Sequence, residues 1–358
     1  MSLKTKRKNP GLLAPIFALT LIAECAAQTP GQAQTAVKND RGAQRVEARV
    51  KTDQSIFDFH SGFWMNLHHF LYQQALAQKE NREGDARRAA RAASEIASIE
   101  ALDTEQKRIW ATVLEHYQKN WVDRDLLFDD DLVKINYRLA ELENETTLKQ
   151  SGLREELVVA LEQAAPVYRA HWWKEHDRVN RSWVAEVASL VRKHGSILGD
   201  QLATAYRERW AKGPIRAEVA IYANWAGAYT TLDPTLITIS STNAAQQGLA
   251  ALEIVFHEAS HAVIGAVMKE ISNECKAQNK QVPRNLWHMT LFYTTGEIVK
   301  RVLSKDGQKD YTPYAYKQGL YQSPNNQRYR LLLEKHWQPY LDGKSDFTQA
   351  IKQMVAGL

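Results

Sequence analysis

Residues 249–270 read LAALEIVFHEASHAVIGAVMKE and contain the pattern H-E-x-x-H at His257, Glu258 and His261. Apolar residues surround the pattern on nearly every face, which predicts a buried helix over about residues 244–270. Residues four apart share a helix face, so both imidazoles can reach one metal ion from adjacent turns. Glu258 projects about 100° further round the helix, off the metal but close to a metal-activated water, where a carboxylate can act as general base.

Two histidines and a glutamate are costly to bury without partners. A zinc ion compensates that cost, and imidazole nitrogens are among its preferred ligands. The sequence therefore predicts a Zn²⁺ site held by His257 and His261. The alternative is an accidental motif formed by two core histidines and a neighbouring glutamate.

A family resemblance rests on this helix. Val255 two positions before the first histidine, then HEASHAVIG and a distant glutamate, resemble the active-site helix of gluzincin metallopeptidases. Over HEASHAVIG alone the chain is similar to the membrane-bound ATP-dependent zinc proteases, which have HEAGH, but it contains no phosphate-binding loop. The gluzincin resemblance covers roughly residues 215–300 and implies a zinc-dependent metallopeptidase.

A catalytic zinc takes three protein ligands and leaves one position for water. The resemblance implies a glutamate on a second helix, and Glu297 in YTTGEIVKR is the preferred candidate. Thr294 and Glu297 also fit a capping box, in which Glu297 would only close a helix start. His288 is the second choice for the third ligand, followed by three acidic residues, Glu270, Glu274 and Asp306.

The resemblance also implies an oxyanion-stabilising side chain and a strand that binds substrate. Tyr314 is the preferred oxyanion residue in DYTPYAYKQGLY, which also contains Tyr311, Tyr316 and Tyr321. The alternative is that these tyrosines only pack a helix–turn region. Strands over residues 217–225 or 235–240 could pair with extended peptide, or could be internal to the sheet.

Helical periodicity dominates residues 56–210, whereas two short alternating or β-branched segments follow the break at Lys212-Gly213-Pro214. The sequence therefore predicts an α+β fold, predominantly α-helical. We expect a helical N-terminal domain over residues 52–212 and a zincin-like catalytic domain over residues 213–358, with a small sheet beside the HExxH helix. The clearest predicted helices of the first domain are Arg87–Leu102, Asp103–Lys119, Arg154–Ala170 and Ser182–His194.

The N-terminus combines a basic start, a short apolar run and small residues, as a secretory signal peptide does. We expect a signal peptide over residues 1–27, a linker over residues 28–51, and export to the periplasm or the medium. A lipid anchor at Cys25 is less favoured, because Glu24 precedes it. Without Cys25 the chain would keep Cys275 alone, which leaves no internal disulfide.

The composition is that of a globular protein, with 44% hydrophobic and 24% charged residues and a net charge of +5 in 358 residues. No dense basic tract with interleaved aromatics follows the N-terminus, so nucleic acid is not an expected partner. No later stretch is long and apolar enough to predict a transmembrane segment in the mature chain.

Further histidines gather in the helical half, at DFHSGFW around His60, at His68 and His69, and at His171 and His176. They could line a cleft opposite the zinc or form a second metal site. Adjacent histidines point to different helix faces, and aromatic-rich helices are usually core, so packing is the alternative.

The predicted function is hydrolysis of peptide bonds by metal-activated water, with Glu258 as general base and a peptide or protein as substrate. Two alternatives remain open: a non-catalytic exported binding protein on a zincin scaffold, and a zinc hydrolase of a non-peptide amide in the cell wall. Glu258 argues against a binding-only protein, because binding needs no general base.

Overall fold

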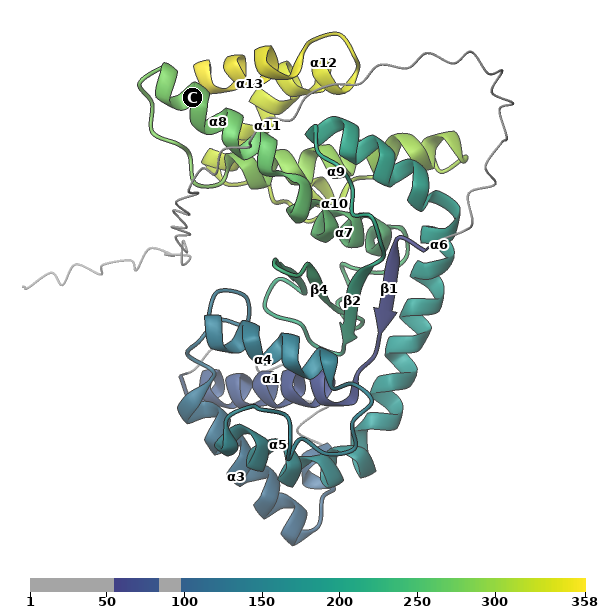
Figure 1. Ribbon diagram of the computed structural model, residues 1–358, viewed down its shortest axis with the longest axis vertical. Coiled ribbons are helices and arrows are strands. Elements are labelled where there is room, and N and C mark those ends of the chain that lie inside the picture. Colours follow the sequence, from purple (N-terminus) through teal and green to yellow (C-terminus); the bar gives the residue numbers. More distant parts are fainter. Residues whose placement is uncertain (1–54, 84–97) are drawn as a thin grey trace, which may run out of the picture. The chain divides into compact units, whose positions relative to one another are not determined.

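The computed structural model describes residues 55–83 and 98–358, which belong to one compact unit. A small sheet lies between two layers of helices (Figure 1). The predicted α+β class with predominant helix is confirmed. The predicted signal peptide and linker lie outside the described residues.

The sheet has four strands in the order β1 (Phe57–His60), β2 (Ile215–Ala220), β4 (Leu236–Ser240), β3 (Ala228–Thr231). β1, β2 and β4 run parallel, and β3 returns antiparallel to β4 at the edge. The two predicted strands correspond to β2 and β4. β1 and β3 were not predicted, because each has only four residues, too few to show a clear alternation.

The first layer of helices packs on the face of the sheet that presents Tyr229 and Leu236. The N-terminus of α3 is set by Asp103, which forms a capping box with Gln106 as sequence chemistry predicts. The predicted segment Arg87–Leu102 lies mostly outside the described residues. This layer contains α1 (Phe63–Glu83), α3 (Thr104–Asn120), α4 (Asp130–Glu141) and α5 (Glu155–Tyr168).

A long helix joins the two layers. The π-turn η1 (Arg169–Trp173) leads directly into α6 (Lys174–Tyr206), which packs against η1 at one end and against α7, α9 and β2 along its length (Figure 1). From Trp183 onward its buried residues belong to the core of the second layer. The two cores therefore do not divide at residue 212, where we placed a domain boundary.

The second layer packs on the other face of the sheet and includes Ile237 and Ile239 in its core. It begins with α7 (Leu249–Ser260), the 3-10 turn η2 (His261–Val263), α8 (Gly265–Ala277) and α9 (Leu286–Lys305). The chain ends with α10 (Tyr314–Lys317), α11 (Pro324–Leu332), the π-turn η3 (Leu333–Trp337), α12 (Gln338–Leu341) and α13 (Phe347–Ala356).

The single helix predicted over residues 244–270 is two helices with a sharp bend. Gly248, with a φ of 58°, precedes the first turn of α7. The chain then tightens at His261, and the two helical parts meet at 60°. Apolar periodicity continued through the bend and concealed it.

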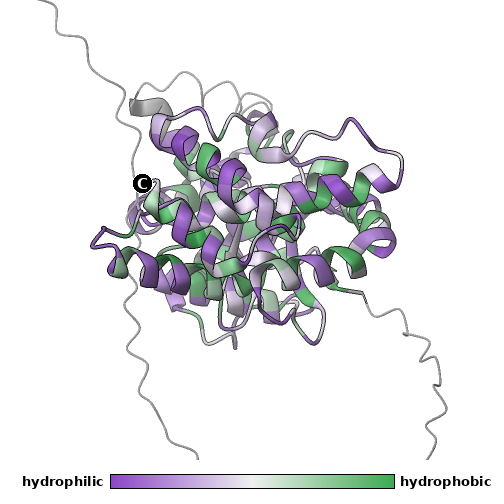
Figure 2. Cartoon of the chain, turned by 90° about the horizontal axis from the view of Figure 1, so that it is seen from above, coloured by the Kyte–Doolittle hydropathy of each residue, from purple (hydrophilic) through white to green (hydrophobic). Residues whose placement is uncertain are grey.

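Within the described residues, no single helix is both long and apolar enough to cross a membrane, and only the bent pair α7–η2 and α8 passes that test jointly. Cys275 on α8 is buried and carries a free thiol. Most helices carry both hydrophilic and hydrophobic residues (Figure 2), as helices with one face on a core do.

Candidate metal centre

The H-E-x-x-H pattern spans the junction of α7 and η2. His257 lies on the last turn of α7 and is 2% exposed, while His261 is the first residue of η2. Their ring centroids are 5.2 Å apart at 86°. The four-residue spacing therefore brings both imidazoles to one place, as predicted.

A third imidazole comes from the first turn of α9. His288 Nε2 lies 3.4 Å from His257 Nε2, and ring nitrogens of His257, His261 and His288 all lie within 4.8 Å of one another. Tetrahedral zinc with Zn–N bonds of about 2.0–2.1 Å places two nitrogen ligands about 3.4 Å apart. The spacing between His257 and His288 fits a shared zinc ion.

Burial keeps these imidazoles neutral, which leaves each ring a lone pair for a metal. Burial lowers the pKa of His257 well below its ordinary value, and His261 and His288 lower it further. Burial also brings the pKa of His261 to about 3, with a smaller effect of His288, and that of His288 to about 4. The donor set therefore suits a soft-to-borderline divalent cation such as Zn²⁺.

The structure brings His288, and not Glu297, to the two motif histidines. Both residues lie on α9, nine positions apart, which places them on opposite helix faces and about 13 Å apart along the axis. A capping box at Thr294 and Glu297 would start the helix there, whereas α9 begins at Leu286. Asn285, just before the apolar run, is the sequence signal that could have placed His288 on a helix.

Glu297 is not a capping residue either. Thr294 lies in the middle of α9 and donates to the Thr290 carbonyl, so the capping-box alternative is wrong. Burial raises the pKa of Glu297, while Lys300 and Arg301 lower it. The three remaining candidates all lie outside the histidine group. Glu270 and Glu274 are on α8, and Asp306, which follows the last residue of α9, is paired with Lys193.

Glu258 points to the edge of the sheet as well as to the histidines. Its Oε2 accepts a hydrogen bond of 2.7 Å from Thr230 Oγ1 and lies 3.9 Å from His261 Nε2. Burial raises the pKa of Glu258 to about 7, and the Thr230 bond opposes that rise. A carboxyl with a pKa near neutrality beside a candidate metal site has the properties of a general base.

Two aromatic residues on α9 fix the histidine rings. Phe292 stacks on His257 with centroids 3.8 Å apart, and Trp287 stacks on His288 at 5.0 Å. His257 Nδ1 is buried with no hydrogen-bond partner among the described residues. Metal-binding histidines are commonly oriented by a hydrogen bond to the other ring nitrogen. In His257 stacking on Phe292 takes that role. We did not predict Phe292, although it lies one turn from His288.

Tyr314 is the tyrosine that faces this region. Its ring lies parallel to that of Phe292, at 6.2 Å and 9°. Burial raises the pKa of Tyr314, an interaction with Gln246 lowers it, and Glu253 and Glu258 raise it. The phenol therefore lies within electrostatic range of Glu258.

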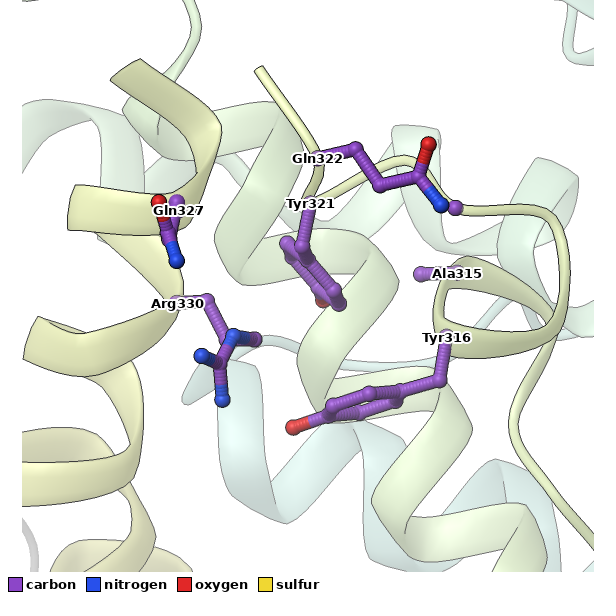
Figure 3. Close-up of a pocket in the computed structure, with 7 residues that line it drawn as sticks. Ala315, Tyr316, Tyr321, Gln322, Gln327 and Arg330 are labelled. Carbon is purple, nitrogen blue, oxygen red and sulfur yellow. The ribbon is translucent and has the colours of Figure 1, made fainter. Parts of the chain in front are cut away.

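Two of the other tyrosines face elsewhere. Tyr316 and Tyr321 line a hollow of about 370 Å³ together with Arg330 (Figure 3). The Tyr316 hydroxyl donates to Glu334 rather than toward the histidines. Tyr311 donates to Glu253 on α7. Position thus favours Tyr314 among the four predicted candidates.

The edge of the sheet next to Glu258 is β3. β2 and β4, the two strands we considered for substrate, both have neighbours on each side, so the internal-strand alternative holds for them. β3 pairs only with β4. The edge strand upstream of the motif helix therefore exists, but over Ala228–Thr231.

A second group, His60, Glu143 and Glu218, also brings its ligand atoms within 4.8 Å. Arg216 lies among them and donates to Glu218 Oε1 at 2.7 Å and to Glu143 Oε2 at 3.0 Å. The guanidinium already supplies positive charge to both carboxylates. We interpret this group as an ionic network that ties β1 and β2 to the loop after α4.

The other predicted histidines belong to internal hydrogen bonds of the first layer. His68 Nδ1 lies 2.8 Å from the Tyr117 hydroxyl, and His69 Nε2 lies 2.9 Å from the Tyr229 hydroxyl. His171 contacts Gln106, and His176 contacts Tyr168. None of these four is in a metal-binding group within the described residues, and packing explains them.

Comparison of the chain with models of protein families, with curated proteins and with solved structures gives no match.

Proposed function

We propose that the protein is a zinc-dependent hydrolase of the zincin type that cleaves peptide bonds, with His257, His261 and His288 as zinc ligands. The observation that carries the proposal is the convergence of three imidazoles, one buried and two half-buried, beside a buried carboxylate. A third histidine departs from the glutamate of the gluzincin pattern. The resemblance to that group therefore extends to the H-E-x-x-H helix only.

The roles of the chain's own residues follow from their positions. Zinc at this site would supply a Lewis acid for the scissile carbonyl and would lower the pKa of a water molecule. Glu258 takes a proton from the attacking water and delivers it to the leaving amine. Thr230 holds the Glu258 carboxylate in place, and Tyr314 stabilises the negative charge that develops on the carbonyl oxygen.

The choice of a peptide as substrate rests on β3. This strand ends the sheet, and its residue Thr230 contacts Glu258. All four residues of β3 are buried, so a peptide would reach the histidines only by pairing with the outer backbone edge of the strand. Backbone pairing to a sheet edge is a common way to bind extended peptides. A peptide bond is thereby presented to the site through main-chain contacts.

Metal content tests the ligand set. Purified wild-type protein should contain about one zinc ion per chain by elemental analysis. His288→Ala should lose or weaken zinc binding, whereas Glu297→Ala, on the same helix, should retain it. Loss of zinc in Glu297→Ala alone would overturn the ligand assignment, and a wild-type protein that takes up no zinc would favour the binding-scaffold alternative.

Cleavage of a peptide library tests the reaction. Wild-type protein should cut peptides, and Glu258→Gln should bind zinc normally while its kcat falls at least a hundredfold. A zinc-loaded wild-type protein that hydrolyses small amides but no peptide would contradict the peptide assignment and favour the cell-wall alternative.

A further inference from the structure

Tyr314 is the first residue of a helix that is too short to be stable on its own. α10 has four residues, Tyr314–Lys317, and follows a stretch without helix or strand after α9. So short a helix has almost no stability of its own. The position of the Tyr314 phenol must therefore be fixed by contacts to other elements.

The principal contact is a buried carboxylate on the motif helix. Glu253 lies on α7, is 1% exposed, and accepts a 2.6 Å hydrogen bond from the Tyr311 hydroxyl at Oε2. Both of its carboxylate oxygens lie 3.0 Å from the Tyr314 backbone N–H, which donates to them. One side chain thus binds both ends of the segment Tyr311–Tyr314.

A glycine on α9 makes room for this segment. A Cβ at Gly296 would lie 2.7 Å from Pro313 Cβ and 3.1 Å from Glu253 Oε1. Distances this short require the neighbours to move. Gly296 therefore lets Pro313 and the Glu253 carboxylate pack directly on α9.

Glu253 and His257 are four residues apart on α7 and so lie on one helix face in adjacent turns. A group that binds Glu253 is therefore held in a fixed position relative to His257 on the same helix. The tyrosine segment and the metal ligand share one support.

We propose that Glu253 is a positioning residue that fastens the segment Tyr311–Tyr314 to the motif helix and thereby holds the Tyr314 ring beside Phe292 at the candidate metal site. This inference rests on the proposed function. It assigns Glu253 no contact with substrate or metal, and its effect on hydrolysis passes through Tyr314.

The position of Tyr314 can be measured without activity by placing 3-fluorotyrosine at residue 314 and recording its ¹⁹F resonance. In otherwise wild-type protein we expect one resonance, which shifts when zinc is added. Glu253→Ala should move the resonance toward that of free 3-fluorotyrosine and abolish the response to zinc. An unchanged resonance in a folded Glu253→Ala protein would overturn the proposal.

Two milder variants keep the test decisive if Glu253→Ala fails to fold. Tyr311→Phe removes one of the hydrogen bonds, and Gly296→Ala pushes Pro313 away, so both should shift the resonance. The matched control is Glu334→Ala, which removes the acceptor of Tyr316 two residues along the chain and should leave the resonance in place. No shift in either folded variant would refute the proposal.

Hydrolysis supplies a second measurement. Glu253→Ala should lower kcat about a hundredfold, the cost of a misplaced catalytic group, with KM nearly unchanged. Glu253→Gln, which keeps one acceptor oxygen, should recover part of that loss. If wild-type protein binds no zinc, the proposed function fails, while the resonance of metal-free protein still reports whether Glu253 places Tyr314.

Discussion

Thr230 Oγ1 donates a 2.7 Å hydrogen bond to Glu258 Oε2 and also lies 2.9 Å from the Glu258 carbonyl oxygen. The next residue back, Tyr229, points to the opposite face of β3, where its hydroxyl contacts His69 and Asn136. Alternation along one short strand therefore joins the Glu258 carboxylate to the first layer of helices.

Removing the hydroxyl of Thr230 should impair the general base without affecting the metal. Thr230→Val keeps the shape of the side chain but deletes the donor to Glu258. We expect kcat to fall about 10–100-fold, because one hydrogen bond to a charged group contributes about 1.5–3 kcal/mol. Steady-state hydrolysis and elemental analysis measure the two effects. Thr231→Val on the same strand is the control, and an equal loss in both variants would argue against a specific role.

Loss of the ring that stacks on His257 should weaken zinc binding. Phe292→Ala leaves the buried His257 ring with neither its stacking partner nor a hydrogen bond at Nδ1. We expect zinc affinity to fall about 10–100-fold, as when an outer partner of a metal ligand is removed. Competition with a zinc-binding dye measures the affinity. Tyr293→Phe, at the next position on α9, should bind zinc as wild type does.

The hydrogen bonds of Tyr229 should stabilise the junction between sheet and first layer. Tyr229→Phe leaves His69 Nε2 and the Asn136 amide without their common partner in a buried place. We expect the free energy of unfolding to fall by about 1–3 kcal/mol. Urea unfolding followed by circular dichroism gives this value. A change below about 0.5 kcal/mol would mean that the interaction contributes little.

The stability of the protein should depend on pH through Glu253. Burial raises its pKa from 4.5 to about 7, hydrogen bonds from Tyr311 and the Tyr314 backbone lower it, and Glu297 raises it. The folded state therefore keeps a proton that the unfolded chain has already released. The resulting stabilisation is complete below about pH 4.5 and is lost as the pH rises to about 7.

Comparison with Glu253→Gln isolates this contribution, because the other titrating groups are shared. Between pH 4.5 and 7 the free energy of unfolding of wild-type protein should fall by roughly 2–4 kcal/mol relative to the variant. Urea unfolding at several pH values tests the difference. Glu297→Gln should move the loss to lower pH, since Glu297 raises the pKa of Glu253. Parallel curves for wild type and Glu253→Gln would contradict the assignment.

Much of the centre could be predicted from residues close in sequence. The spacing of His257, Glu258 and His261 sufficed to predict two converging imidazoles and an offset carboxylate, because helix geometry fixes that relationship locally. The third histidine depends on how α9 packs on α7, which no local pattern specifies. The gluzincin resemblance favours Glu297, but the packing of α9 on α7 brings His288 to the motif histidines instead.

The fold shows the same limit. Helices of the first layer follow from periodicity and caps, as at Asp103. β1 and β3 could not be predicted, because their stability comes from pairing with strands elsewhere in the chain. The contact between Thr230 and Glu258 depends on that pairing and was therefore also beyond prediction.

The pairing of β1 with β2 bears on whether the first layer of helices could serve as a removable inhibitory segment. Phe57 pairs with Ile215, and its side chain packs on Phe256, next to His257. A protease that cut the chain between the two layers would produce a nicked protein whose fragments remain joined through the sheet and through α6. Release of the first fragment would strip a strand from the sheet and an aromatic ring from beneath the motif helix. Loss of the first layer would therefore also disturb the packing beneath His257.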